Sequence, residues 1–144
     1  MTKKFTFLEH MADVYIEAYG NTLEELFENS AIAMFEVMTD TSKVKPIEVK
    51  SVKTDGFDLE SLLYCWLEEW LIIHDSENMV FSKFKVNTIK KVNEEEYVIE
   101  GYGWGEKFNP RVHEVRTEVK AVTYHMMEIK QINGKWIARF LLDI

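Results

Sequence analysis

The segment from Asp58 to Asp75 places the strongest constraint on the fold of this chain. Its apolar residues recur at intervals of three and four, the spacing that gathers side chains on one face of an α-helix. Asp58 is suited to cap the first turn, because its carboxylate can accept a hydrogen bond from a backbone N–H group there. We therefore expect a helix whose apolar face, with Trp66 and Trp70 as anchors, fills a core. The face consists of Leu59, Leu62, Leu63, Trp66, Leu67, Trp70 and Leu71.

A second amphipathic helix is predicted after Gly20. Asn21 or Thr22 can cap its first turn, and Glu24 or Glu25 follows at the distance that a capping box requires. Its apolar residues again have helical spacing. They are Leu23, Leu26, Phe27, Ala31, Met34, Phe35 and Met38.

The other ordered segments have the alternating pattern of β-strands. Pro46 favours an edge position for its strand, because proline cannot donate to the ladder. Asp55-Gly56 is typical of a turn, and Asn133-Gly134 predicts a tight hairpin. Helices embedded among runs of strands predict an α+β fold, a mostly antiparallel β-sheet with two helices packed on one face. The expected strands are Phe5–Glu9, Val14–Tyr19, Val44–Lys53, Val80–Val92, Tyr97–Trp104, Glu118–Gln131 and Trp136–Asp143.

Length and charge limit the classes of protein to consider. With 144 residues and no Pro- or Gly-rich linker, residues 1–144 are expected to form a single domain. The 25 Asp and Glu residues outnumber the 17 Lys and Arg residues, which gives a formal net charge of −8. This charge opposes association with phosphate backbones, so direct RNA binding is not expected.

The apolar runs and the one cysteine indicate where in the cell the protein is expected. No apolar run approaches the roughly 18 residues that a membrane-spanning helix needs, and the polar start of the chain does not resemble a signal peptide. Cys65 has no partner for a disulfide. It lies in the apolar face of the helix predicted from Asp58, where it would act as a small hydrophobic residue that fills space in the core. We therefore expect a cytoplasmic protein without membrane contact.

Acidic residues near the two ends of the chain are the candidates for a metal site. Asp13 lies in the predicted loop between the first two strands, and Asp143 and Ile144 end the last strand. If the fold brings these ends together, two carboxylates and the terminal carboxylate of Ile144 offer hard oxygen ligands. Such ligands favour Ca²⁺ or Mg²⁺ over Zn²⁺. The alternative is a set of solvated carboxylates at strand ends.

Other polar residues give weaker indications. The four histidines are too far apart in sequence for a zinc motif. His10 could orient a carboxylate of the Asp13 loop or could be structural. Lys120 stands in an apolar strand and could contact a partner or simply be a surface lysine. The sequence lacks a Gly-rich phosphate loop and a nucleophile elbow, which argues against an enzyme.

Several segments, in this order along the chain, together resemble the archease family. They combine a His-x-Ala-Asp-Val loop, a Lys-Ala-Val-Thr-Tyr-His strand and a terminal Asp-Ile, and the match covers nearly the whole chain. One departure is Met11, where family members commonly have threonine, which affects the loop's hydrogen bonding rather than its aspartate. The segments are Phe7–Val14, Thr22–Asn29, Leu59–Leu63, Glu118–His125 and Asp143-Ile144.

The resemblance implies an archease-like fold and an accessory role rather than an enzyme. Archeases promote guanylylation of the RtcB-type tRNA-splicing RNA ligase, raise its turnover and broaden its nucleotide use. The family's metal ligands match Asp13, Asp143 and Ile144, with Ca²⁺ as the expected ion and Mg²⁺ or another divalent ion as alternatives. Lys120 matches a lysine that the family uses functionally. Two other functions remain open: a metal-dependent hydrolase using the same carboxylates, and a general chaperone or modulator of nucleic-acid-processing enzymes.

Overall fold

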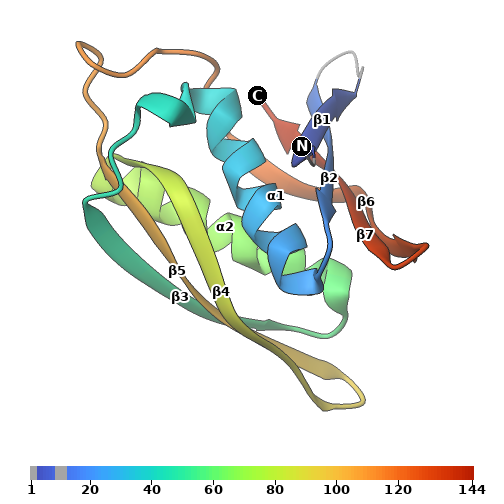
Figure 1. Ribbon diagram of the computed structural model, residues 1–144. Helices are drawn as coiled ribbons and strands as arrows, with labels where there is room; N and C mark the ends of the chain where they lie inside the picture. The colour runs from blue at the N-terminus through green and yellow to red at the C-terminus, as the bar shows by residue number, and fades with distance from the viewer. Residues whose placement is uncertain (1–2, 9–12) are drawn as a thin grey trace.

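A computed structural model describes residues 3–8 and 13–144, and Figure 1 shows how its elements are arranged. Within these residues, no helix is long and apolar enough to cross a membrane. The elements in chain order are β1 (Phe5–Leu8), β2 (Asp13–Gly20), α1 (Leu23–Met38), a 3₁₀ helix η1 (Thr41–Lys43), β3 (Glu48–Gly56), α2 (Leu59–Glu77), β4 (Met79–Asn93), β5 (Glu96–Lys107), β6 (Ala121–Ile132) and β7 (Lys135–Asp143).

The strands form two sheets. One has four strands in the order β1-β2-β7-β6, and the other has three in the order β3-β5-β4. Every pairing is antiparallel. The predicted α+β class with a mostly antiparallel arrangement is confirmed, and the structure adds that the strands divide between two sheets rather than forming one.

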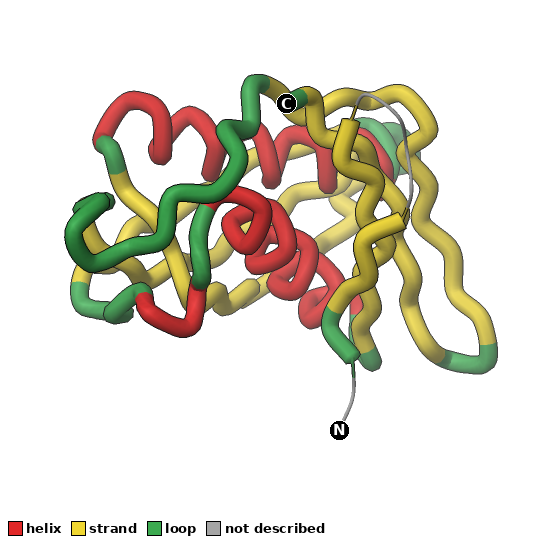
Figure 2. The backbone as a smooth tube through the Cα atoms, turned by 90° about the horizontal axis from the view of Figure 1, so that it is seen from above, coloured by secondary structure: helices red, strands yellow, loops and turns green. Residues whose placement is uncertain are grey.

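Each of the two helices packs against both sheets. Helix α1 packs on β2 of the first sheet and β4 of the second, and α2 packs on β6 and β3. Figure 1 shows both helices between the sheets, and Figure 2 shows the same arrangement from above. Because each helix contacts both sheets, one hydrophobic core extends through the molecule.

Both predicted helix starts are confirmed by their caps. The Thr22 hydroxyl accepts a hydrogen bond from the Glu25 N–H at 3.0 Å, and the Glu25 carboxylate accepts one from the Asn21 N–H at 3.0 Å. The Asp58 carboxylate accepts a bond from the Ser61 N–H at 2.7 Å, which starts α2. Such caps satisfy N–H groups that a helix leaves unpaired at its start.

The tryptophans of α2 pack against glycines of β5. Trp66 and Trp70 are fully buried, and their rings meet edge to face with centroids 5.5 Å apart. A Cβ atom at Gly101 would lie 2.8 Å from the Trp66 ring, and one at Gly103 would lie 2.7 Å from the Trp70 ring. The predicted anchoring role of the tryptophans is confirmed, and the glycines allow the helix to approach the sheet closely.

Several local differences from the predicted strands occur. Asp13, predicted in a loop, begins β2, and Lys120, predicted within a strand, lies just before β6. β3 begins at Glu48, after Pro46, and includes Asp55-Gly56 at its end instead of turning there. β6 contains a large bulge, since Thr123 pairs with Leu141 and Glu128 pairs with Arg139, so residues 124–127 lie opposite a single residue of β7. The predicted hairpin at Asn133-Gly134 is confirmed, and both residues have positive φ, at 52° and 78°.

Candidate metal centre

Asp13 and Asp143 lie side by side in the four-stranded sheet. Asp13 begins β2, Asp143 ends β7, and the two residues are directly paired in the antiparallel ladder. Residues that face each other in this way have side chains on the same face of the sheet, with Cβ atoms about 5 Å apart. The structure therefore brings together the two aspartates that the sequence analysis proposed as ligands.

The third strand brings Lys120 to the same place. Ala121, the first residue of β6, pairs with Asp143, and the Lys120 N–H donates a hydrogen bond to the Asp143 carbonyl oxygen at 2.7 Å. Ile144 follows Asp143 directly and is half-buried. Asp13, Lys120, Asp143 and Ile144 thus gather at one end of the sheet, where the chain's C-terminus is drawn in Figure 1.

The two aspartates project from the face of the sheet that is turned away from the core. The neighbouring row of the ladder, Val14, Leu142 and Val122, packs into the hydrophobic core. Because successive side chains of a strand point to opposite faces, the aspartate row points outward. A ligand bound between these carboxylates would therefore be reached from outside the core.

A buried hydroxyl lies on the same face, two residues from the aspartates. Thr123 pairs with Leu141, and its hydroxyl oxygen is buried without a hydrogen-bond partner among the described residues. A buried hydroxyl without a partner costs about 1–3 kcal/mol. Such an oxygen fits the surroundings of a site whose occupant supplies hydrogen-bonding groups.

The donor set fits a hard cation. Asp13, Asp143 and the carboxylate of Ile144 offer only oxygen, the donor that Ca²⁺ and Mg²⁺ prefer. Among residues 3–8 and 13–144, no three His, Cys, Asp or Glu side chains form a group that could hold a metal. Like charges at facing positions of a sheet are unfavourable, and a cation between the two carboxylates would offset that cost. His10 and Met11 lie outside the described residues.

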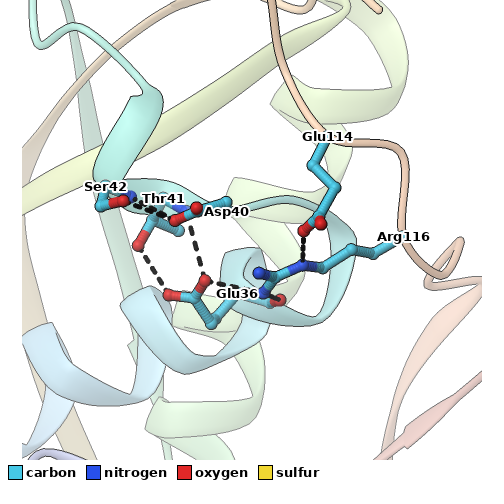
Figure 3. Close-up of polar contacts among 6 residues, drawn as sticks. All are labelled: Glu36, Asp40, Thr41, Ser42, Glu114 and Arg116. Atoms are coloured by element: carbon cyan, nitrogen blue, oxygen red, sulfur yellow. Dashed lines mark hydrogen bonds and ion pairs between the residues drawn. The ribbon is translucent and has the colours of Figure 1, made fainter.

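The segment from 108 to 120, which leads to Lys120, is held against the end of α1. The N–H groups of Arg116 and Thr117 donate to the carbonyl oxygens of Met38 and Val37, each at 3.1 Å. The Arg116 guanidinium donates to the Glu36 carboxylate at 2.8 Å and to the Glu36 carbonyl at 2.9 Å, and it also contacts Glu114 (Figure 3). These bonds fix the path of the chain just before β6.

Glu36 also ties this segment to the turn after α1. Its carboxylate accepts hydrogen bonds from the hydroxyl of Thr41 at 2.8 Å and from the Thr41 N–H at 3.3 Å. In the same turn, the Asp40 carboxylate accepts bonds from Ser42, and those bonds hold the pKa of Asp40 below its usual value (Figure 3). One glutamate thus links α1, η1 and the segment that delivers Lys120.

A buried histidine anchors the start of the same segment. His113 is 3% exposed, its Nδ1 accepts a hydrogen bond from the Asn109 N–H at 2.9 Å, and its Nε2 lies 2.8 Å from the Glu106 carboxylate. The first bond requires a bare Nδ1, so Nε2 carries the proton and donates to Glu106. Burial opposes ionisation of Glu106, but the Lys45 N–H and His113 outweigh it and lower its pKa. Spacing in the sequence gave no sign of this pair.

Comparison with known proteins assigns the chain to a family. The model of the archease protein family matches residues 5–144, so the chain belongs to that family. It is 55% identical over 142 residues to the archease of Sulfurisphaera tokodaii, covering 99% of both chains. It is 51% identical to an archease of Saccharolobus islandicus, again with 99% of both chains covered. The predicted family resemblance is confirmed.

Solved structures agree with this assignment. The solution structure of protein 1598 from Methanobacterium thermoautotrophicum is 49% identical, has a TM-score of 0.87, and is matched over 99% of this chain and 100% of its own. The crystal structure of an archease from Thermotoga maritima is 21% identical, with a TM-score of 0.58 over 100% of this chain and 98% of its own. The second likeness concerns the fold alone. The roles of Asp13, Asp143, Ile144 and Lys120 stay predictions.

Proposed function

We propose that this archease is a metal-binding accessory protein of the cytoplasm that activates the RtcB-type tRNA-splicing RNA ligase. It would promote guanylylation of the ligase, raise its turnover and broaden its nucleotide use, and the ligase would carry out the covalent chemistry. Membership of the archease family supports this role. The observation that carries the proposal is the direct pairing of Asp13 with Asp143 on the outward face of the sheet.

In this proposal, Asp13, Asp143 and Ile144 hold a Ca²⁺ ion, with Mg²⁺ or another divalent ion as the alternative. The bound ion would supply positive charge between the two facing carboxylates. The sheet would hold the two aspartates in a fixed relative position, because every residue of β2 is paired with β7. Lys120, placed by its backbone bond to Asp143, would contact the ligase beside the ion.

Multiple-turnover RNA ligation by the cognate RtcB-type ligase tests this function. Wild type should raise turnover, and Asp13→Asn and Asp143→Asn should each abolish most of that effect. Asp75→Asn, which changes an exposed aspartate of α2, serves as the matched control and should stimulate like wild type. Failure of well-folded wild type to stimulate the ligase would refute the proposed function, and full stimulation by both site variants would refute the role of the carboxylates.

A second candidate function is that of a general chaperone. The Thermotoga maritima archease is described as a possible chaperone. In this chain, Phe57, Tyr124 and Met126 are large apolar residues that remain exposed, as a chaperone surface requires. A chaperone would suppress aggregation of an unrelated heat-denatured protein, and Asp143→Asn would leave that effect unchanged. If Asp143→Asn lost both the stimulation of the ligase and the suppression of aggregation, the result would instead favour the metal-dependent activator.

A further inference from the structure

A groove lies at the start of α2, away from the paired aspartates. Its volume is about 820 Å³, and it is lined by Ser61, Tyr64 and Cys65 on the first turns of α2. Phe57, just before α2, and Tyr124, in the bulge of β6, also line it. β3 and β6, the strands that α2 packs against, are each the outer strand of a sheet. The groove therefore lies between two sheet edges.

Aromatic side chains are unusually exposed in this groove. Phe57 is 64% exposed and Tyr124 is 45% exposed. The Tyr124 ring meets the Tyr64 ring edge to face with centroids 5.8 Å apart. Tyr124 lies within the bulge of β6, and Met126 in the same bulge has a φ of 62°, a conformation that costs a non-glycine residue free energy. Exposed aromatic residues that are held in place in this way are typical of interaction surfaces.

The electrostatic character of the groove is negative. Asp55, Glu95 and Glu96 lie on its rim, and none of the described residues that line it is Lys or Arg. Burial and nearby carboxylates affect the ionisable groups that line the groove. Burial raises the pKa of Tyr124, and the carboxylates of Asp58 and Glu60 raise it further. Burial likewise raises the pKa of Cys65, and Glu68 and Asp55 add to the increase.

We propose that this groove binds an extended basic segment of a partner protein, in which Arg or Lys side chains alternate with apolar ones. The cationic groups would lie over the rings of Phe57 and Tyr124 and pair with the carboxylates of the rim. The apolar side chains would enter the groove between them. A nucleic acid is disfavoured as the occupant, because its phosphates would face the acidic rim. Binding here would not require the carboxylates of Asp13 and Asp143.

Fluorescence anisotropy with the full chain and a labelled peptide of alternating Arg and Leu residues tests this proposal. Phe57→Ala should weaken binding about threefold to fivefold through the lost cation–π contact. The double variant Glu95→Gln/Glu96→Gln should weaken it about fivefold, because two ion pairs at the rim are lost. Both changes are at the surface, and circular dichroism will verify that the variants are folded.

Matched controls come from the same surface. Glu94 lies in the same hairpin turn with its side chain 97% exposed, and it does not line the groove, so Glu94→Gln should bind the peptide like wild type. Ile47→Ala removes an exposed apolar side chain elsewhere and should also bind normally. A peptide with Glu in place of Arg should not bind.

Three results would overturn the proposal. The first is absence of binding of the Arg-Leu peptide to wild type at low ionic strength. The second is equal loss of affinity in Glu94→Gln and in the double variant, which would indicate general charge attraction. The third is displacement of the peptide by spermine at equal concentration, which would show that the groove takes a small polycation instead.

Discussion

Asp143→Asn is expected to make the chain more stable than wild type in a chelator and less stable than wild type in calcium. Asp143 faces Asp13 across the β2–β7 pairing, and like charges at facing positions destabilise a sheet. Asparagine has nearly the same shape and removes one of the two charges. The backbone bond between the Lys120 N–H and the Asp143 carbonyl does not involve the altered side chain. The variant should therefore be more stable than wild type in a chelator.

The magnitudes follow from general values. Relief of one facing like-charge pair should add about 0.5 kcal/mol, which raises Tm by about 2 °C for a chain of this size. Calcium at 100 times its dissociation constant should stabilise wild type by about 2.7 kcal/mol, which corresponds to about 9 °C. Asparagine cannot supply the lost charge, so the variant should lose most of the calcium-dependent gain. In calcium, wild type should therefore melt at a higher temperature than Asp143→Asn, the reverse of the order in a chelator.

Scanning calorimetry of both proteins in a chelator and in calcium measures these four temperatures. Asp75→Asn is the control and should show the same calcium shift as wild type. If Asp143→Asn is less stable than wild type in chelator, the aspartates do not repel each other as their pairing indicates. If Asp143→Asn keeps the full calcium shift, Asp143 is not a ligand.

Three further predictions concern the packing and the polar contacts of the fold. Gly103→Val should destabilise the chain by about 2 kcal/mol in urea unfolding, because the added side chain meets the Trp70 ring; an unchanged midpoint would contradict this packing. The pKa of Glu17 is lowered by the Tyr19 hydroxyl, against the effect of burial, and then by Arg139. A lowered pKa stabilises the fold above the unfolded-state pKa, and this contribution is lost as the pH falls through the folded-state pKa. Glu17→Gln should therefore be less stable than wild type at neutral pH, with the difference closing in acid; a constant difference in chemical denaturation from neutral to acidic pH would refute it. Arg116→Ala removes the contacts with Glu36 and should speed hydrogen exchange at the Thr117 N–H; unchanged exchange would show that the backbone bonds alone hold the segment.

The helices could be predicted from the sequence because their signals are local. The caps at Thr22 and Asp58 and the apolar faces that follow them depend on residues within a few turns. The bulge of β6 could not be predicted, because the alternation in residues 121–132 does not show that several of them face one residue of β7. The start of β3 was misplaced because the apolar residues around Pro46 resemble a strand. Strand boundaries depend on partners that are distant in sequence.

The candidate metal centre was predicted only in part for the same reason. The residue types at positions 13, 143 and 144 indicated oxygen ligation, but bringing them together required β2 and β7 to be neighbours, which no local pattern shows. The family resemblance supplied that step. The groove at Phe57 and Tyr124 was missed, because these lining residues come from segments before α2 and within β6 whose proximity depends on the packing of α2 between the sheets.

The position of the two aspartates links metal binding to the folding of the whole chain. Asp13 lies near the beginning of the sequence and Asp143 near its end, and they meet only when β2 and β7 pair in the centre of the four-stranded sheet. An unfolded chain would hold these carboxylates far apart and would bind a cation weakly. A ligand that binds the folded state preferentially stabilises it by mass action. The candidate centre is therefore a product of the complete fold rather than of a local motif, so a change in the core that loosens the β2–β7 pairing would weaken cation binding without touching a ligand.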